Sequence, residues 1–178
     1  NYTGATDTEA TYAPAAKEGF SVADSSVLKG NIAADGSLVL KVYYSRNDYT
    51  ITYNVDGKEH KVETYKFGAD ITILEEPNKE GYTFSGWDKT LDATMPAENI
   101  VINGSFSVNA YTITYNVDGA EHKVETYDYG TALEILKAPV KEGHTFSGWD
   151  SSLPATMPAE NLVINGTFSP NTYKITYM

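Results

Sequence analysis

The amino-acid sequence predicts a mostly β protein, a tandem array of three related units that forms an elongated rod. Three observations predict this fold class. Segments recur at one constant spacing, apolar and polar residues alternate within each period, and turn-forming dipeptides separate the alternating stretches. The connection between one period and the next is short, which favours a stiff array over flexibly linked domains.

The repeat defines two complete units. Residues 49–57 recur unchanged at 111–119, and 111 − 49 gives a period of 62. Residues 49–110 and 111–172 are identical at 44 of 62 positions when they are aligned without a gap. This degree of identity predicts that both repeat units have the same fold.

The period continues into the N-terminal part of the chain. Lys17-Glu18-Gly19 recurs at 79–81 and again at 141–143, and the apolar pattern of 17–48 recurs with it. Residues 1–48 are therefore predicted as a divergent N-terminal repeat unit, the back part of a related module. Residues 1–12 also resemble 54–65, at an offset of 53, so their place in the unit stays open.

A third copy of the Tyr-x-Ile-Thr-Tyr segment ends the chain at 173–178. It is either a strand that closes the last unit or one that opens a further unit. Because its tyrosines and isoleucine alternate with polar residues, we predict that Tyr173–Tyr177 is paired as a strand.

Within each repeat unit, the elements follow in order. Residues 49–55 alternate as a half-buried strand, Asp56-Gly57 suits a tight hairpin turn, and 60–67 forms the returning strand. Residues 100–108 alternate again, and Asn103-Gly104 inside them is interpreted as a bulge or a close-packing point.

One stretch of each repeat unit is ambiguous between helix and extended chain. Thr131–Leu136 begins with Thr followed three residues later by Glu, a helix-capping pattern. Its counterpart 69–74 is rich in β-branched residues, which favour extended chain. The sequence leaves open one short helix in each module.

Composition excludes several classes of function. The chain carries 13 basic and 24 acidic residues, a net charge of −11, which opposes binding to nucleic acid. It has no cysteine, and its apolar runs are too short for membrane insertion. A solvated extracellular surface fits this composition. The chain begins with Asn1, so we interpret it as a segment of a longer protein.

The repeated motifs resemble a known family. Tyr-Thr-Ile-Thr-Tyr, Lys-Glu-Gly-Tyr-Thr-Phe-Ser-Gly-Trp and Thr-Met-Pro-Ala-Glu-Asn, in this order over 49–172, are similar to the Listeria–Bacteroides repeat, also called the internalin B-repeat. Residues 17–48 resemble a variant akin to mucin-binding-protein modules, although Ser25 stands at the tryptophan position. The resemblance implies β-grasp-like modules that act as spacers in secreted, wall-attached bacterial proteins.

Trp87 and Trp149 are the candidate ligand-binding residues, because exposed indoles stack on sugar rings. We favour packing instead, since each follows a glycine that can turn the side chain into a core. His60 and His122 are one repeated position next to lysine. We find no catalytic motif and no metal-ligand motif, so we predict no enzyme, no cofactor and no metal.

The leading functional hypothesis is a non-catalytic stalk or spacer of a bacterial cell-surface adhesin-like protein. It would project another domain from the cell, act as a monomer, and contact mainly neighbouring repeats of its own chain. Two alternatives stay open: a binding module for mucin, another host glycan or a protein ligand, and self-association through strand edges.

Overall fold

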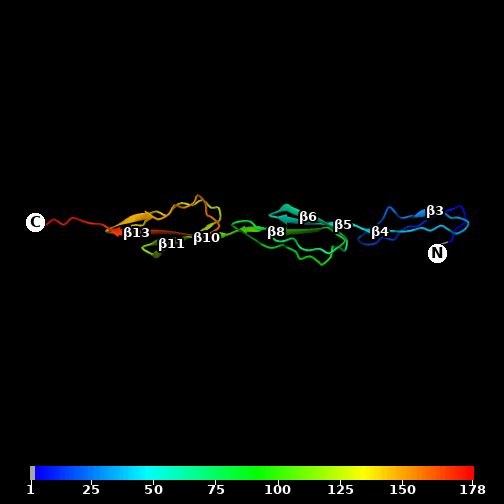
Figure 1. The fold of residues 1–178 in the computed structure, drawn as a ribbon, viewed down its shortest axis with the longest axis horizontal. Helices are drawn as coiled ribbons and strands as arrows, with labels where there is room; N and C mark the ends of the chain where they lie inside the picture. The colour runs from blue at the N-terminus through cyan, green and yellow to red at the C-terminus, as the bar shows by residue number, and fades with distance from the viewer. Residues whose placement is uncertain (1–2) are drawn as a thin grey trace. The chain divides into compact units, whose positions relative to one another are not determined.

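The computed structural model describes residues 3–178, which form β-strands and no helix (Figure 1). This confirms the mostly β fold class. The described residues divide into two compact units, one made of 3–75 with 86–104, the other of 76–85 with 105–178. The strands are β1 (Glu9–Thr11), β2 (Phe20–Val22), β3 (Lys29–Asn31), β4 (Tyr44–Arg46), β5 (Asp48–Val55), β6 (Lys58–Lys66), β7 (Tyr82–Phe84), β8 (Ile100–Gly104), β9 (Phe106–Val108), β10 (Ala110–Val117), β11 (Ala120–Asp128), β12 (His144–Trp149) and β13 (Leu162–Pro170).

In the first compact unit, β5 is the central strand of a three-stranded sheet with the order β6-β5-β8. β5 and β6 form the predicted hairpin, in which Asp56 and Gly57 both have positive φ angles of 51° and 74°. Such angles suit a two-residue turn that matches the twist of the strands. β8 runs parallel to β5, and the sheet buries Ile51, Tyr53 and Ile102 against Met95.

The second compact unit repeats this arrangement in a four-stranded sheet of order β11-β10-β13-β12 (Figure 1). β10 and β11 form the hairpin, and β13 pairs parallel to β10 with Ile113 opposite Leu162. Ile113, Tyr115, Met157 and Ile164 are buried at the same positions of the repeat as in the first unit. The alternation in the sequence therefore predicts the buried face of both central strands.

Residues 3–48, predicted as the back part of a related module, share part of this strand pairing. β2 pairs antiparallel with β4, as β7 pairs with β9 one period further along the chain. β1 pairs with β3, so that Glu9 lies opposite Asn31. A shift of both positions by 62 gives Ile71 and Ala93. The N–H of Ile71 donates to the carbonyl of Ala93 at 3.1 Å. This register follows the period of 62, whereas Asn1, which belongs to the resemblance at an offset of 53, lies outside the described residues.

The ambiguous stretch at 131–136 is extended. The N–H of Leu133 donates to the carbonyl of Ala155, and Ala132 forms an antiparallel bridge with Thr156. Leu133 and Leu136 pack against the buried cluster of the second unit. Pairing with 155–157 and burial of two leucines therefore outweigh the local capping pattern, and the possible short helix is wrong.

The predicted close-packing point lies at Gly166, the counterpart of Gly104. A Cβ at Gly166 would overlap the ring of Phe146, and it would lie 3.1 Å from Cε3 of Trp149. Glycine is required here because aromatic side chains of the neighbouring strand β12 cross the backbone of β13.

The prediction that Tyr173–Tyr177 is a paired strand is wrong. Residues 171–178 form no strand, and Tyr173, Ile175 and Tyr177 are 76%, 74% and 89% exposed (Figure 1, red). Among residues 3–178, the copies of this segment, β5 and β10, pair with strands that follow them in the chain. This pairing is the one expected if the Tyr-x-Ile-Thr-Tyr strand opens a repeat unit.

We expect that deletion of 173–178 leaves the unfolding temperature of the chain unchanged, because its large side chains are exposed and bury little apolar surface. Circular dichroism during heating measures this. Two point variants provide a matched comparison: Ile175→Ala should have no effect, whereas Ile113→Ala in the buried copy should cost about 2–5 kcal/mol. A lower unfolding temperature after the deletion would contradict the assignment.

Candidate functional site

The candidate tryptophans pack against the cores of their repeat units. Trp87 and Trp149 are both half-buried and contact the buried clusters. The Nε1–H of Trp87 donates to the carbonyl of Leu74 at 2.8 Å, and that of Trp149 donates to Leu136 at 2.7 Å. Each indole thus has its polar group engaged by the backbone while its ring covers the core.

The glycine before each tryptophan allows this placement. Gly86 and Gly148 have φ angles of 84° and 97°, a region that other residues rarely adopt. In the second unit, the register of β12 against β13 shifts between Phe146 and Trp149. This bulge turns Trp149 so that its ring lies 5.0 Å from that of Tyr115 and 4.9 Å from that of Phe146. The geometry matches the packing that the Gly-Trp sequence predicts.

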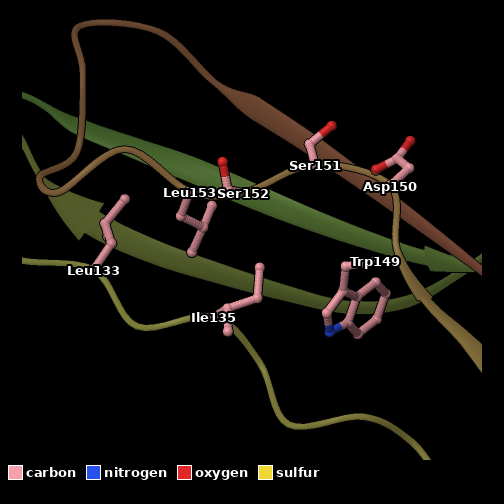
Figure 2. A pocket seen from close by; sticks show the side chains of 7 residues that line it. All are labelled: Leu133, Ile135, Trp149, Asp150, Ser151, Ser152 and Leu153. Atoms are coloured by element: carbon pink, nitrogen blue, oxygen red, sulfur yellow. The ribbon is translucent and has the colours of Figure 1, made fainter.

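A surface cavity lies beside Trp149 (Figure 2). Its volume is about 560 Å³. In Figure 2, the side chains of Leu133, Ile135 and Leu153 point toward one another beside the indole of Trp149, while the oxygens of Ser151 and Ser152 point away from them. The cavity combines an aromatic ring with aliphatic walls, which suits an apolar face of a ligand. It is lined by Leu133, Ile135, Trp149, Asp150, Ser151, Ser152 and Leu153.

The carboxylate next to each tryptophan has a structural role. Asp150 accepts hydrogen bonds from the backbone N–H of Asn165 at 2.8 Å and from its side-chain amide at 2.9 Å. Asp88 accepts the same two hydrogen bonds from Asn103. The backbone hydrogen bond is the main cause that lowers the pKa of both carboxyl groups below the usual value of 3.8.

This lowered pKa predicts an acid dependence of stability. The pKa of Asp150 is lower in the folded state than in the unfolded state. The carboxylate therefore contributes its full stabilisation at pH values above its pKa in the unfolded state, and this stabilisation is lost as the pH falls through its pKa in the folded state. We expect Asp150→Asn to lower the urea midpoint at pH 7, and the difference from wild type to shrink as the pH falls below about 3.8. Asp88→Asn is the matched variant. A difference independent of pH would contradict this role.

The other polar candidates form no catalytic arrangement that the described residues reveal. Glu63, near His60, pairs with Lys61 at 2.7 Å and accepts a hydrogen bond from Tyr65. His60 and His122 lie on the exposed hairpin strands β6 and β11. Within residues 3–178, no group of three or more His, Cys, Asp or Glu residues is arranged to hold a metal ion. The same residues contain no helix that could cross a membrane.

A second recurring site, which the sequence did not reveal as such, surrounds the glycine of Lys-Glu-Gly. Gly81 is buried, and a Cβ there would overlap the ring of Tyr129. The ring of Tyr129 also meets that of Tyr82 edge-on at 5.9 Å. Gly19 has the same relation to Phe67, whose ring meets that of Phe20 at 5.6 Å.

Backbone hydrogen bonds fix this aromatic–glycine contact through one asparagine. The N–H of Asn109 donates to the carbonyl of Gly81, and the carbonyl of Asn109 accepts from the N–H of Tyr129, both at 2.9 Å. Asn47 makes the same two bonds with Gly19 and Phe67. We call each glycine with its asparagine a glycine socket, and each aromatic residue with its following glycine (67–68, 129–130) an aromatic corner.

The sequence signal for these sockets is the recurrence of Lys-Glu-Gly, which by itself indicates only the period. The aromatic partner follows its glycine at the same separation in both cases, since 67 − 19 and 129 − 81 both give 48. It follows the second hairpin strand of the next repeat. No local pattern connects two positions so far apart.

Comparison with known proteins identifies the repeat. The family model of the Listeria-Bacteroides repeat domain matches residues 49–108 and 111–160. Internalin H of Listeria monocytogenes is 37% identical over 143 residues, which cover 69% of this chain and 25% of that protein. A putative membrane protein of Evansella cellulosilytica is 26% identical over 159 residues, or 79% of this chain and 24% of that protein.

Among solved structures, the Streptococcal High Identity Repeats in Tandem domains 3-4 from a cell surface protein match with a TM-score of 0.27 and 19% identity. This match covers 68% of the chain and 99% of that structure. The chain spans about a quarter of the length of the two sequence relatives. Two consecutive matches to one family model cover more than half of the chain, so it belongs to the Listeria-Bacteroides repeat family.

Proposed function

We propose that this chain is a non-catalytic stalk or spacer segment of a bacterial cell-surface, adhesin-like protein. Its relatives include a putative membrane protein, and the chain corresponds to only about a quarter of each relative's length. A repeated segment within a longer protein suits the projection of another domain from the cell. The net charge of −11 and the lack of cysteine are compatible with an extracellular location.

The aromatic–glycine contact is the observation that carries this proposal. Tyr129 and Phe67 are each held on a glycine socket of the preceding module. In each contact, the aromatic ring lies against the backbone of the glycine, and the backbone N–H of the aromatic residue donates to the carbonyl of the asparagine. We expect such a contact to restrain the hairpin of one repeat against the Lys-Glu-Gly segment of the preceding repeat, which a spacer requires.

Spin labels can test whether this restraint holds the repeats. The chain has no cysteine, so Glu59→Cys and Glu121→Cys place one label on each hairpin. Pulsed electron–electron double resonance then measures the distribution of distances between the two labels. We expect a narrow distribution, which Tyr129→Ala broadens because the corner no longer rests on Gly81.

Phe67→Ala is the matched control for this experiment. It removes the same contact at the preceding socket, where Phe67 lies against Gly19, so this contact does not join the two labelled repeats to each other. It should therefore leave the distribution narrow. A wild-type distribution as broad as that of Tyr129→Ala would refute a rigid spacer.

The cavity beside Trp149 supports a second candidate function, the binding of a mucin-type or other host glycan. A glycan array with the intact chain tests this candidate, and Ile135→Asp, which places charge on the exposed aliphatic wall, should abolish any binding found. Self-association through sheet edges has less support, because the edge strands β6 and β11 carry charged residues.

A further inference from the structure

We propose that Gly143 and Asn171 form a third glycine socket, open in this chain, that receives the aromatic corner of another repeat of the same kind. The occupant is a repeat that continues the chain from Tyr173, the position at which β5 and β10 begin their own units. This inference deepens the spacer proposal and rests on it for its biological purpose. The contact itself is tested separately.

The third socket has the internal hydrogen bonds of the other two. The N–H of Asn171 donates to the carbonyl of Gly143 at 2.8 Å, as Asn109 does to Gly81 at 2.9 Å. The hydroxyl of Thr145 donates to the side chain of Asn171 at 2.6 Å, a bond that Thr83 and Asn109 form at the same distance. The socket is therefore built before any corner occupies it.

The surface over Gly143 is open where the other two sockets are covered. Within residues 3–178, no atom beyond its chain neighbours would come within 4 Å of a Cβ at Gly143, whereas a Cβ at Gly81 would overlap Tyr129. Gly81 is buried and Gly143 is half-buried, and Asn171 is exposed where Asn109 is half-buried. Asn109, whose carbonyl accepts from Tyr129 at the second socket, thus has an exposed counterpart at the third.

The neighbouring side chains define what the open socket can bind. Its floor is a glycine with a φ of 71°, so a flat ring can rest directly on the backbone. His144 replaces Tyr82 beside it and meets Phe168 edge-on at 6.4 Å. Lys141 lies 5.4 Å from the centre of the Phe168 ring. A phenyl or phenol ring followed by glycine, with a free backbone N–H for Asn171, fits this surface.

The nuclear magnetic resonance signals of the glycine α-protons in the chain provide a direct test. A ring stacked on a glycine shifts one of its α-proton resonances strongly upfield, so Gly19 and Gly81 should show this shift in the intact chain and Gly143 should not. We then compare the chain with an extended form, in which residues 1–172 are followed by a second copy of 111–178. In the extended form, the Gly143 resonance should move upfield as that of Gly81 does.

A variant of the extended form controls for indirect effects. It carries Tyr→Ala only at the appended copy of Tyr129, and it should leave the Gly143 resonance where it is in the intact chain. The indole N–H signal of the appended tryptophan reports that the added repeat has folded. An unshifted Gly143 beside a folded added repeat overturns the proposal, as does an unshifted Gly81 in the intact chain. The label distances test the spacer proposal independently of either result.

Discussion

Substitution of Trp149 by alanine is expected to lower the free energy of unfolding by about 3 kcal/mol or more, as removal of a large aromatic side chain from a core does. The indole packs against the buried cluster around Tyr115 and Met157. Its removal also leaves the carbonyl of Leu136 without the hydrogen bond from Nε1. Both losses act on the same repeat, so the effect is large although the ring is only half-buried.

Urea unfolding followed by far-ultraviolet circular dichroism measures this effect. Trp87→Ala should cost a similar amount, because its ring packs 5.1 Å from Tyr53 and its Nε1–H bonds Leu74. Val163→Ala is the control: Val163 lies on β13 of the same repeat but is 58% exposed, and it should change stability by no more than about 0.5 kcal/mol. Unchanged stability of Trp149→Ala together with lost glycan binding would favour the ligand-binding function instead.

The sequence predicts the hairpins and the tryptophan packing because their determinants are local. The Asp56-Gly57 turn requires positive φ at two consecutive residues, and the alternation of Tyr49–Val55 assigns one face to the core. The glycine before Trp149 provides the bulge that its packing needs. In each case, a few adjacent residues determine the local backbone conformation or the face that is buried.

The remaining features depend on partners that are distant in the sequence. The extended form of Thr131–Leu136 is decided by its pairing with Ala155, which no capping pattern reveals. The alternation of Tyr173–Tyr177 predicts a paired strand wrongly, because its copies β5 and β10 form strands with partners that follow them in the chain. Each socket requires a glycine and a ring that lie far apart in the chain, and recurrence alone does not pair them.

The strongest test of the socket is the comparison of Gly81→Ala with Gly143→Ala. The two glycines share the Lys-Glu-Gly sequence and have φ angles of 75° and 71°. Alanine in this region costs about 1–2 kcal/mol at either position, because its Cβ approaches the following carbonyl. Only at Gly81 does the new Cβ also overlap the ring of Tyr129. We therefore expect Gly81→Ala to destabilise the chain more than Gly143→Ala, by an amount that urea unfolding measures.

Tyr129→Ala separates the two causes, because it removes the ring and leaves the backbone angle as it is. In the Tyr129→Ala background, the cost of Gly81→Ala should fall to that of Gly143→Ala, since only the backbone strain remains. The cost of Gly143→Ala should be the same in both backgrounds, because Tyr129 does not reach that socket. Equal costs for the two glycine variants in the wild-type background would mean that the ring of Tyr129 moves aside freely. The contact could then neither restrain neighbouring repeats nor provide a binding surface at Gly143.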